Sequence, residues 1–184
     1  MTETSSIPKI CSGVGIVGQL MFFVFGFFFH WPAMWYLELP TVQYTGGAYS
    51  WCGKATGFGS WSCSSIGSAE AEAFGHEWGA YMGIRVMVAF AYITGIVAII
   101  LLYVNLCVKK RGVATAGVGF AAAECLFVLI AAALCSSTFS EAFGLDTDPA
   151  YAMFMAWVAW ITTILVTVMA VLALVFTIKD ENKV

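Results

Sequence analysis

Four long apolar stretches constrain the fold of this chain more than any other feature of its sequence. They cover residues 10–29, 81–107, 113–135 and 151–178. A helix needs about 20 mostly apolar residues to cross the hydrocarbon core of a bilayer, and each stretch is long enough. The stretches are apolar on every side, whereas strands of a membrane barrel alternate apolar and polar residues. The sequence therefore predicts four membrane-spanning helices.

The composition excludes several other classes of protein. Only 10% of the residues are charged, against about 25% in soluble domains, so a water-exposed globular surface is not expected. The apolar content of 61% is the opposite of a disordered composition. A net charge of −3 gives no basic surface for nucleic acid. We predict a mainly α membrane protein with a single four-span domain, 1–184, folded as a left-handed four-helix bundle among membrane lipids.

Lysine and arginine predict the orientation of the spans. Six of them lie in segments 1–9, 108–112 and 179–184, whereas segments 30–80 and 136–150 together hold only Lys54. Because cytoplasmic loops carry the excess of basic residues, we expect both termini in the cytoplasm of a multi-pass plasma-membrane protein. The first stretch is longer than the apolar region of a signal peptide, so we expect it to remain as an anchor.

The long extracellular segment 30–80 is predicted to contain a small antiparallel β-sheet. Short aromatic runs are separated there by Thr45-Gly46-Gly47 and by Gly57-Phe58-Gly59, which we interpret as turns. Cys52 and Cys63 are its only cysteines, with ten residues between them. A disulfide is expected in an oxidising compartment and would stabilise a lobe too small for its own core. The alternative is a pair of buried free thiols.

These features resemble the claudin superfamily, which includes claudins, peripheral myelin protein 22 relatives and channel gamma subunits. That superfamily has a Trp after span one, then Gly-Leu-Trp-x-x-Cys, and a second Cys about ten residues later. Here the pattern falls on Trp31, on Gly47-Ala48-Tyr49-Ser50-Trp51-Cys52 and on Cys63. Tyr49 and Ala48 depart from the motif. Placing the motif on Gly59–Cys63 instead would keep its Trp but leave no later cysteine in the segment.

The resemblance implies a role for one residue and a function for the protein. Arg85, at the outer start of span two, would brace the extracellular lobe. The protein would be a structural one that mediates cell–cell adhesion or a paracellular barrier, through its sheet and lateral homo-oligomers, at cell junctions. The main alternative is an auxiliary gamma-type subunit of a larger membrane channel or receptor. A four-span membrane-organising protein of the MARVEL type is a third possibility, favoured only if the two cysteines are unlinked.

A few residues within or beside the spans suggest other roles. Glu124 lies midway along span three, where a carboxylate is costly, so we expect it to be neutral, paired or next to a polar cavity. Cys11 and Cys107 lie at cytoplasmic span ends and are candidates for palmitoylation. The only histidines, His30 and His76, lie in no metal-binding pattern. The sequence also has no C-x-x-C pair and no phosphate-binding glycine loop, so we expect no enzyme activity, cofactor or metal.

Overall fold

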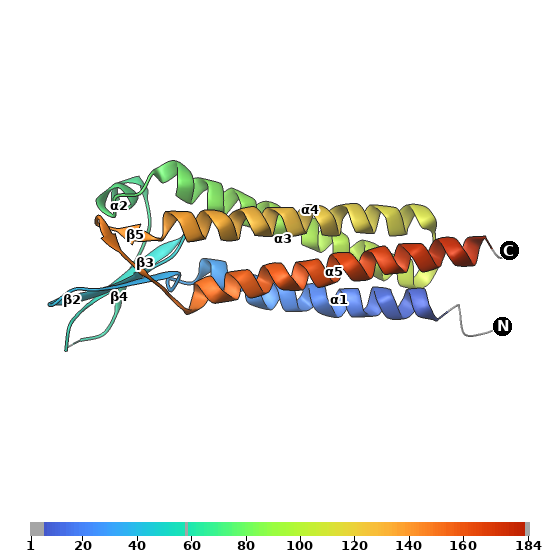
Figure 1. The fold of residues 1–184 in the computed structure, drawn as a ribbon, viewed down its shortest axis with the longest axis horizontal. Helices are drawn as coiled ribbons and strands as arrows, with labels where there is room; N and C mark the ends of the chain where they lie inside the picture. Colours follow the sequence, from blue (N-terminus) through green and yellow to red (C-terminus); the bar gives the residue numbers. More distant parts are fainter. Residues whose placement is uncertain (1–5, 58, 183–184) are drawn as a thin grey trace. The chain divides into compact units, whose positions relative to one another are not determined.

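The computed structural model describes residues 6–57 and 59–182, and it is mainly helical (Figure 1). Four of its helices are long and apolar enough to cross a membrane, which confirms that prediction. They are α1 (Ile7–Gly26), α3 (Trp78–Val108), α4 (Arg111–Thr138) and α5 (Tyr151–Glu181). The first continues as a short 3-10 helix, η1 (Phe27–His30).

The exposed sides of these helices are apolar. Val17, Ile93, Leu126 and Ile161 each expose more than half of their side chain, and each lies on a different long helix. A helix at the surface of a water-soluble protein places polar residues at such positions. The apolar exposed sides therefore suggest a multi-pass membrane protein.

The chain forms two compact units. Among the described residues, the helix unit comprises 6–24, 89–128 and 159–182. The sheet unit comprises 25–88 and 129–158. We describe each unit separately, and keep these two names below.

Small side chains form the core of the helix unit. Five buried residues make one cluster: Ala98, Leu102, Ala121, Val166 and Ala170. Three of the five are alanine, which lets neighbouring helix backbones approach closely. Close packing of this kind holds transmembrane helices together where the surrounding lipid is as apolar as the side chains.

The connection between α3 and α4 is a tight turn. Lys109 adopts a positive φ of 47°, and its amide donates a hydrogen bond to the carbonyl oxygen of Asn105. A left-handed residue directly after the last helical residue is a common way to end a helix. The next helix begins at Arg111, whose amide donates to a carboxylate oxygen of Glu181 at 3.1 Å. The two helices thus follow one another with almost no loop.

The sheet unit contains an antiparallel five-stranded sheet in the order β4-β3-β2-β1-β7. Four consecutive strands form a meander, which confirms the predicted small antiparallel sheet: β1 (Trp35–Glu38), β2 (Val42–Gly46), β3 (Ser50–Ala55) and β4 (Ser62–Ser65). The fifth, β7 (Asp148–Pro149), comes from the connection between α4 and α5. The unit also contains a short helix, α2 (Ser68–Ala73), and a two-stranded ribbon of β5 (Glu141–Ala142) and β6 (Leu145–Asp146). The parts of the long helices within 25–88 and 129–158 belong to it as well.

The first turn of the sheet differs from the prediction. Thr45 and Gly46 belong to β2, so the turn lies after them, at residues 47–49. Gly46 pairs with Trp35 across the strands, and a Cβ at Gly46 would lie 2.6 Å from Cε2 of the Trp35 ring. The glycine therefore makes room for a neighbouring ring within the strand. In the second predicted turn, Gly57 has a positive φ of 85°, and Phe58 lies outside the described residues.

Candidate functional site

The candidate functional site is the part of the sheet where a disulfide links β3 to β4. Cys52 lies directly opposite Cys63, and the two form a disulfide, as predicted. β4 is an edge strand, and all four of its residues are exposed. A free edge of this kind presents unpaired backbone N–H and C=O groups to another chain. The disulfide thus fixes the shape of the strand pair that is open to a partner.

One face of the sheet packs on an aromatic cluster. The buried Trp35 ring lies edge-on to Phe74, with centroids 5.4 Å apart, and the Trp51 ring does the same at 5.6 Å. Phe74 also contacts Phe143, at 5.0 Å between centroids. Aromatic pairs prefer such edge-to-face geometry. The motif residue Trp51 is therefore a packing residue on the core face of the sheet.

Arg85 on α3 is bonded to the backbone of the sheet. Its Nε donates to the carbonyl oxygen of Ala48 at 2.8 Å, and its Nη2 donates to that of Ile66 at 2.8 Å. Its guanidinium also lies over two aromatic rings, 5.1 Å from the centroid of Tyr49 and 4.9 Å from that of Trp78. Ala48 is in the turn before β3, and Ile66 directly follows β4. Ser50 at the start of β3 pairs with Ser65 at the end of β4, so Ala48 and Ile66 flank the same end of the strand pair. One cation therefore bonds to the backbone on both sides of the open end of the disulfide-linked pair, away from the connection between β3 and β4.

The surroundings of Tyr49 change the pKa of its side chain. Burial raises the pKa of its phenol, and the nearby Arg85 guanidinium acts in the opposite direction. The phenol therefore stays neutral around pH 7 and contributes an aromatic face beneath the cation. Arg85 recognises backbone oxygens and ring faces here, and sequence analysis had not identified those partners.

Two further motif residues lie at the base of the strand pair. The Gly47 amide donates to the carbonyl oxygen of Ser50 at 2.9 Å, and a Cβ at Gly47 would collide with the carbonyl oxygen of Trp31. The Trp31 ring is half exposed and packs against Phe27 and Phe28, each with centroids 6.2 Å from its own. Gly47 therefore lets the chain after η1 approach the first turn of the sheet closely.

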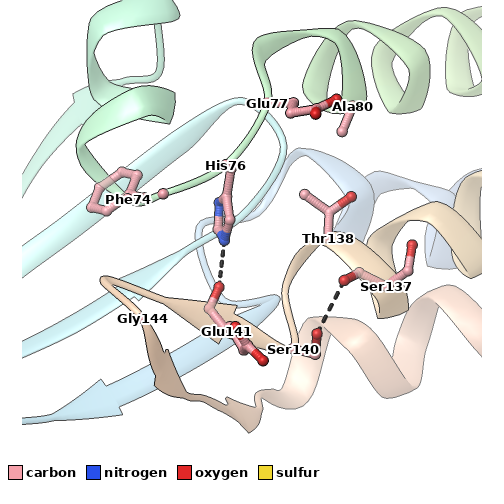
Figure 2. A pocket seen from close by; sticks show the side chains of 10 residues that line it. Phe74, His76, Glu77, Ala80, Ser137, Thr138, Ser140, Glu141 and Gly144 are labelled. Atoms are coloured by element: carbon pink, nitrogen blue, oxygen red, sulfur yellow. Dashed lines mark hydrogen bonds between the residues drawn. The ribbon is translucent and has the colours of Figure 1, made fainter.

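A polar cavity of about 520 Å³ lies beside His76 (Figure 2). The Nδ1 of His76 is 2.8 Å from the hydroxyl of Tyr81, and its Nε2 is bonded to the carbonyl oxygen of Glu141. A carbonyl oxygen only accepts, so Nε2 carries the hydrogen and Nδ1 accepts from the tyrosine. His76 thus connects the segment between α2 and α3 to β5. Sequence analysis missed this contact, because Glu141 is far away along the chain.

The hydroxyl groups at the edge of this cavity are held by the backbone. The Oγ of Ser140 donates to the carbonyl oxygen of Ser137 at 3.0 Å, a contact that Figure 2 also shows. The Oγ of Ser137 in turn donates to the carbonyl oxygen of Leu134 at 3.1 Å. Both hydroxyl groups therefore bond to backbone carbonyl oxygens at the C-terminal end of α4, and neither is bonded to the ring of His76 in the structure.

Glu124 lies in the helix unit, where it is fully buried. Its Oε1 accepts a hydrogen bond from Nε2 of Gln19 on α1. Gly95 on α3 is adjacent, since a Cβ there would lie 2.6 Å from Oε1 of Glu124. The partner of Glu124 is an uncharged amide on another helix, so the contact is a hydrogen bond and not an ion pair. Sequence analysis had not singled out Gln19, although it is a polar residue in the middle of an apolar stretch.

The two candidate palmitoylation sites differ in exposure. Cys11 is buried within the helix unit, whereas Cys107 is exposed near the end of α3. An acylating enzyme needs an accessible thiol, so acylation stays a hypothesis for Cys107 and is not supported at Cys11. Among the described residues, no group of three His, Cys, Asp or Glu side chains is placed to hold a metal ion.

Comparisons with known proteins assign the chain to no family. No protein-family model matches the chain, and no curated protein matches it either.

Proposed function

We propose that this protein is a claudin-like structural membrane protein, which mediates cell–cell adhesion or a paracellular barrier. One observation carries the proposal: a disulfide-linked pair of strands is bonded at its open end, through the backbone on both sides, to an arginine from an apolar helix. The arrangement gives a small sheet a fixed shape that a membrane helix can present to a partner. The same residues, Cys52, Cys63 and Arg85, carry the sequence resemblance to the claudin superfamily.

The proposal places the sheet outside the cell, on a left-handed four-helix bundle in the plasma membrane. A disulfide persists in an oxidising compartment, which supports an extracellular sheet. Lys109 and Lys110 lie between α3 and α4, and Arg111 begins α4; these three residues support a cytoplasmic position for that turn. Both termini would then be cytoplasmic; residues 1–5 and 183–184 lie outside the described part of the chain.

In this proposal the exposed edge of the sheet makes the contacts. Strand β4 pairs with β3 on one side only, and its residues are exposed. Backbone groups at such an edge can add a strand from another copy of the protein. Lateral pairing of edges would build homo-oligomers, and opposed assemblies on two cells would produce adhesion or a barrier.

Mixing two labelled cell populations tests the proposal. Cells that express the protein should accumulate it where they touch one another, and monolayers should gain electrical resistance. Replacing Cys52 and Cys63 by serine should abolish both effects, whereas Cys125→Ser, at a free cysteine on α4, should leave them intact. If wild-type protein at the cell surface gave neither accumulation nor resistance, the proposal would be wrong.

A second candidate function is an auxiliary subunit of a channel or receptor. Positions Gly13 and Gly119 favour it, because the space that a Cβ would occupy there is open. A helix of a larger partner could approach the backbone at such positions. Purification in a mild detergent distinguishes the two functions: a co-purifying channel favours this one, and homo-oligomers favour the first. The MARVEL-type alternative depended on unlinked cysteines, and the structure links them.

A further inference from the structure

A second cavity of the sheet unit, of about 460 Å³, lies on the face of the sheet opposite to the aromatic core. We call it the Trp61 cavity. It is lined by four consecutive residues after α1 and by four residues of the β2–β4 region: His30, Trp31, Pro32, Ala33, Thr45, Cys52, Trp61 and Cys63. Thr45 and Cys63 each pair with Cys52 across the strands, so these three share one face. Two indole rings, a proline and the disulfide make the lining predominantly apolar.

This cavity begins where the first apolar helix ends. The candidate membrane span extends to His30, and the next three residues all line the cavity. Phe27, near the end of that span, exposes 56% of its side chain, and its ring contacts the half-exposed Trp31. An apolar surface therefore continues from the lipid-facing side of the helix to the cavity. Aromatic rings at this position mark the boundary between lipid and water.

A cation lies over one of the rings that line this cavity. The Nζ of Lys54 is 4.9 Å from the centroid of the Trp61 ring, and that ring is 40% exposed. Lysine binds phosphate groups as a point charge. Binding sites for small molecules are typically concave and mostly apolar, with a few polar groups that orient the ligand, and enclose roughly 300–1,000 Å³. The Trp61 cavity has this size and this lining, and Lys54 lies over one of its rings.

We propose that the Trp61 cavity binds one membrane phospholipid. Part of an acyl chain would lie against Trp31, Ala33 and the disulfide, and the phosphate would lie toward Lys54. The location at the end of a membrane span argues for a ligand that comes from the bilayer, and the lysine argues for one with an anionic group. The proposal depends on the membrane spans and is independent of the adhesive or auxiliary function.

Native mass spectrometry of the full-length protein tests this proposal. The protein, purified in a mild detergent, is titrated separately with phosphatidylglycerol, phosphatidylcholine and cholesterol. Wild type should retain one phospholipid. Ala33→Phe fills the cavity and should weaken that binding by about tenfold or more, equivalent to about 1.4 kcal/mol. Ala80→Phe, the same change in the lining of the polar cavity beside His76, is the matched control and should retain the lipid.

Two further readouts keep the proposal falsifiable if Ala33→Phe disturbs the sheet. The first is Lys54→Gln, which should weaken the binding of phosphatidylglycerol more than the binding of cholesterol. The second readout is the fluorescence of Trp61, taken as the difference in emission between wild type and Trp61→Phe. This fluorescence should be weaker in nanodiscs of phosphatidylcholine brominated at carbons 6 and 7 than in nanodiscs of the unbrominated lipid. Unquenched Trp61 emission, equal lipid retention by Ala33→Phe and wild type, or preferential retention of cholesterol would each overturn the proposal. So would a loss of self-association in Ala33→Phe with lipid retention unchanged, because a second copy would then be the occupant.

Discussion

The sheet unit and the helix unit stabilise polar groups in different ways. In the sheet unit, the charged side chain of Arg85 donates to two backbone carbonyl oxygens and lies over two rings. In the helix unit, Gln19 and Glu124 bond to each other, and one oxygen of each has no hydrogen-bond partner in the described structure. A few strong links fix the shape of the small sheet, whereas many weak contacts between closely packed backbones hold the helices.

The largest effect should come from removing the cation of the sheet unit. Arg85→Met should lower the free energy of unfolding by roughly 3–5 kcal/mol, because each hydrogen bond from a charged donor contributes about 1.5–3 kcal/mol. Hydrogen–deuterium exchange should become faster in β3 and β4 and stay unchanged in the helix unit. Arg111→Met, at an exposed position of α4, is the control, with an expected effect within about 0.5 kcal/mol. Equal protection of β3 and β4 in Arg85→Met would show that the bonds to Ala48 and Ile66 do not stabilise the sheet.

Loss of the disulfide should have a slightly smaller effect. The double variant Cys52→Ser and Cys63→Ser should destabilise the sheet unit by about 2–4 kcal/mol, since the cross-link restricts the unfolded chain. Equilibrium unfolding in mixed micelles of dodecyl maltoside and SDS measures this. Cys125→Ser is the matched single-thiol control and should change little. The reduced wild type and the double variant both lack the cross-link, so they should be equally stable. A difference between them would be an effect of the serine side chains and not of the lost disulfide.

The sequence predicted the parts of both units that depend on local patterns. Apolar length predicted the four helices, and two isolated cysteines in one segment predicted the disulfide. The location of Arg85 near the start of its helix was visible in the sequence. Its partners at Ala48 and Ile66 were not, because they are backbone atoms of the segments that flank a strand pair.

Contacts between distant segments were not predictable. Strand β7 contributes only Asp148 and Pro149 to the sheet, opposite Tyr36 and Trp35, and two residues have no detectable alternation. The first turn was misplaced for a similar reason, since Gly46 lies within β2 and makes room for the Trp35 ring. The partner of Glu124 could have been found by asking which other span carries a polar residue at its centre, and Gln19 is such a residue.

In the helix unit, adding one methyl group should have opposite effects at two glycines. Gly95→Ala should destabilise by about 2 kcal/mol, because the new Cβ would lie within 2.6 Å of Oε1 of Glu124 in a buried position. Gly119→Ala should stabilise by about 0.5–1 kcal/mol, since nothing lies near its Cβ position and alanine favours a helix. Unfolding in the same mixed micelles compares them. A neutral or stabilising effect of Gly95→Ala would show that Gly95 makes no room for the polar pair.

The smallest effect should be the coupling between Gln19 and Glu124. A double-mutant cycle with Gln19→Leu and Glu124→Leu should give a coupling energy of about 1 kcal/mol, because hydrogen bonds between transmembrane helices average about 0.6 and reach about 1.7 kcal/mol. The control cycle pairs Gln19→Leu with Asn105→Leu. Asn105 lies ten positions beyond Gly95 on α3, about 15 Å along the helix, so its coupling to Gln19 should be within about 0.5 kcal/mol of zero. A coupling near zero in both cycles would mean that close packing around Gly95, rather than the bond itself, holds these helices together.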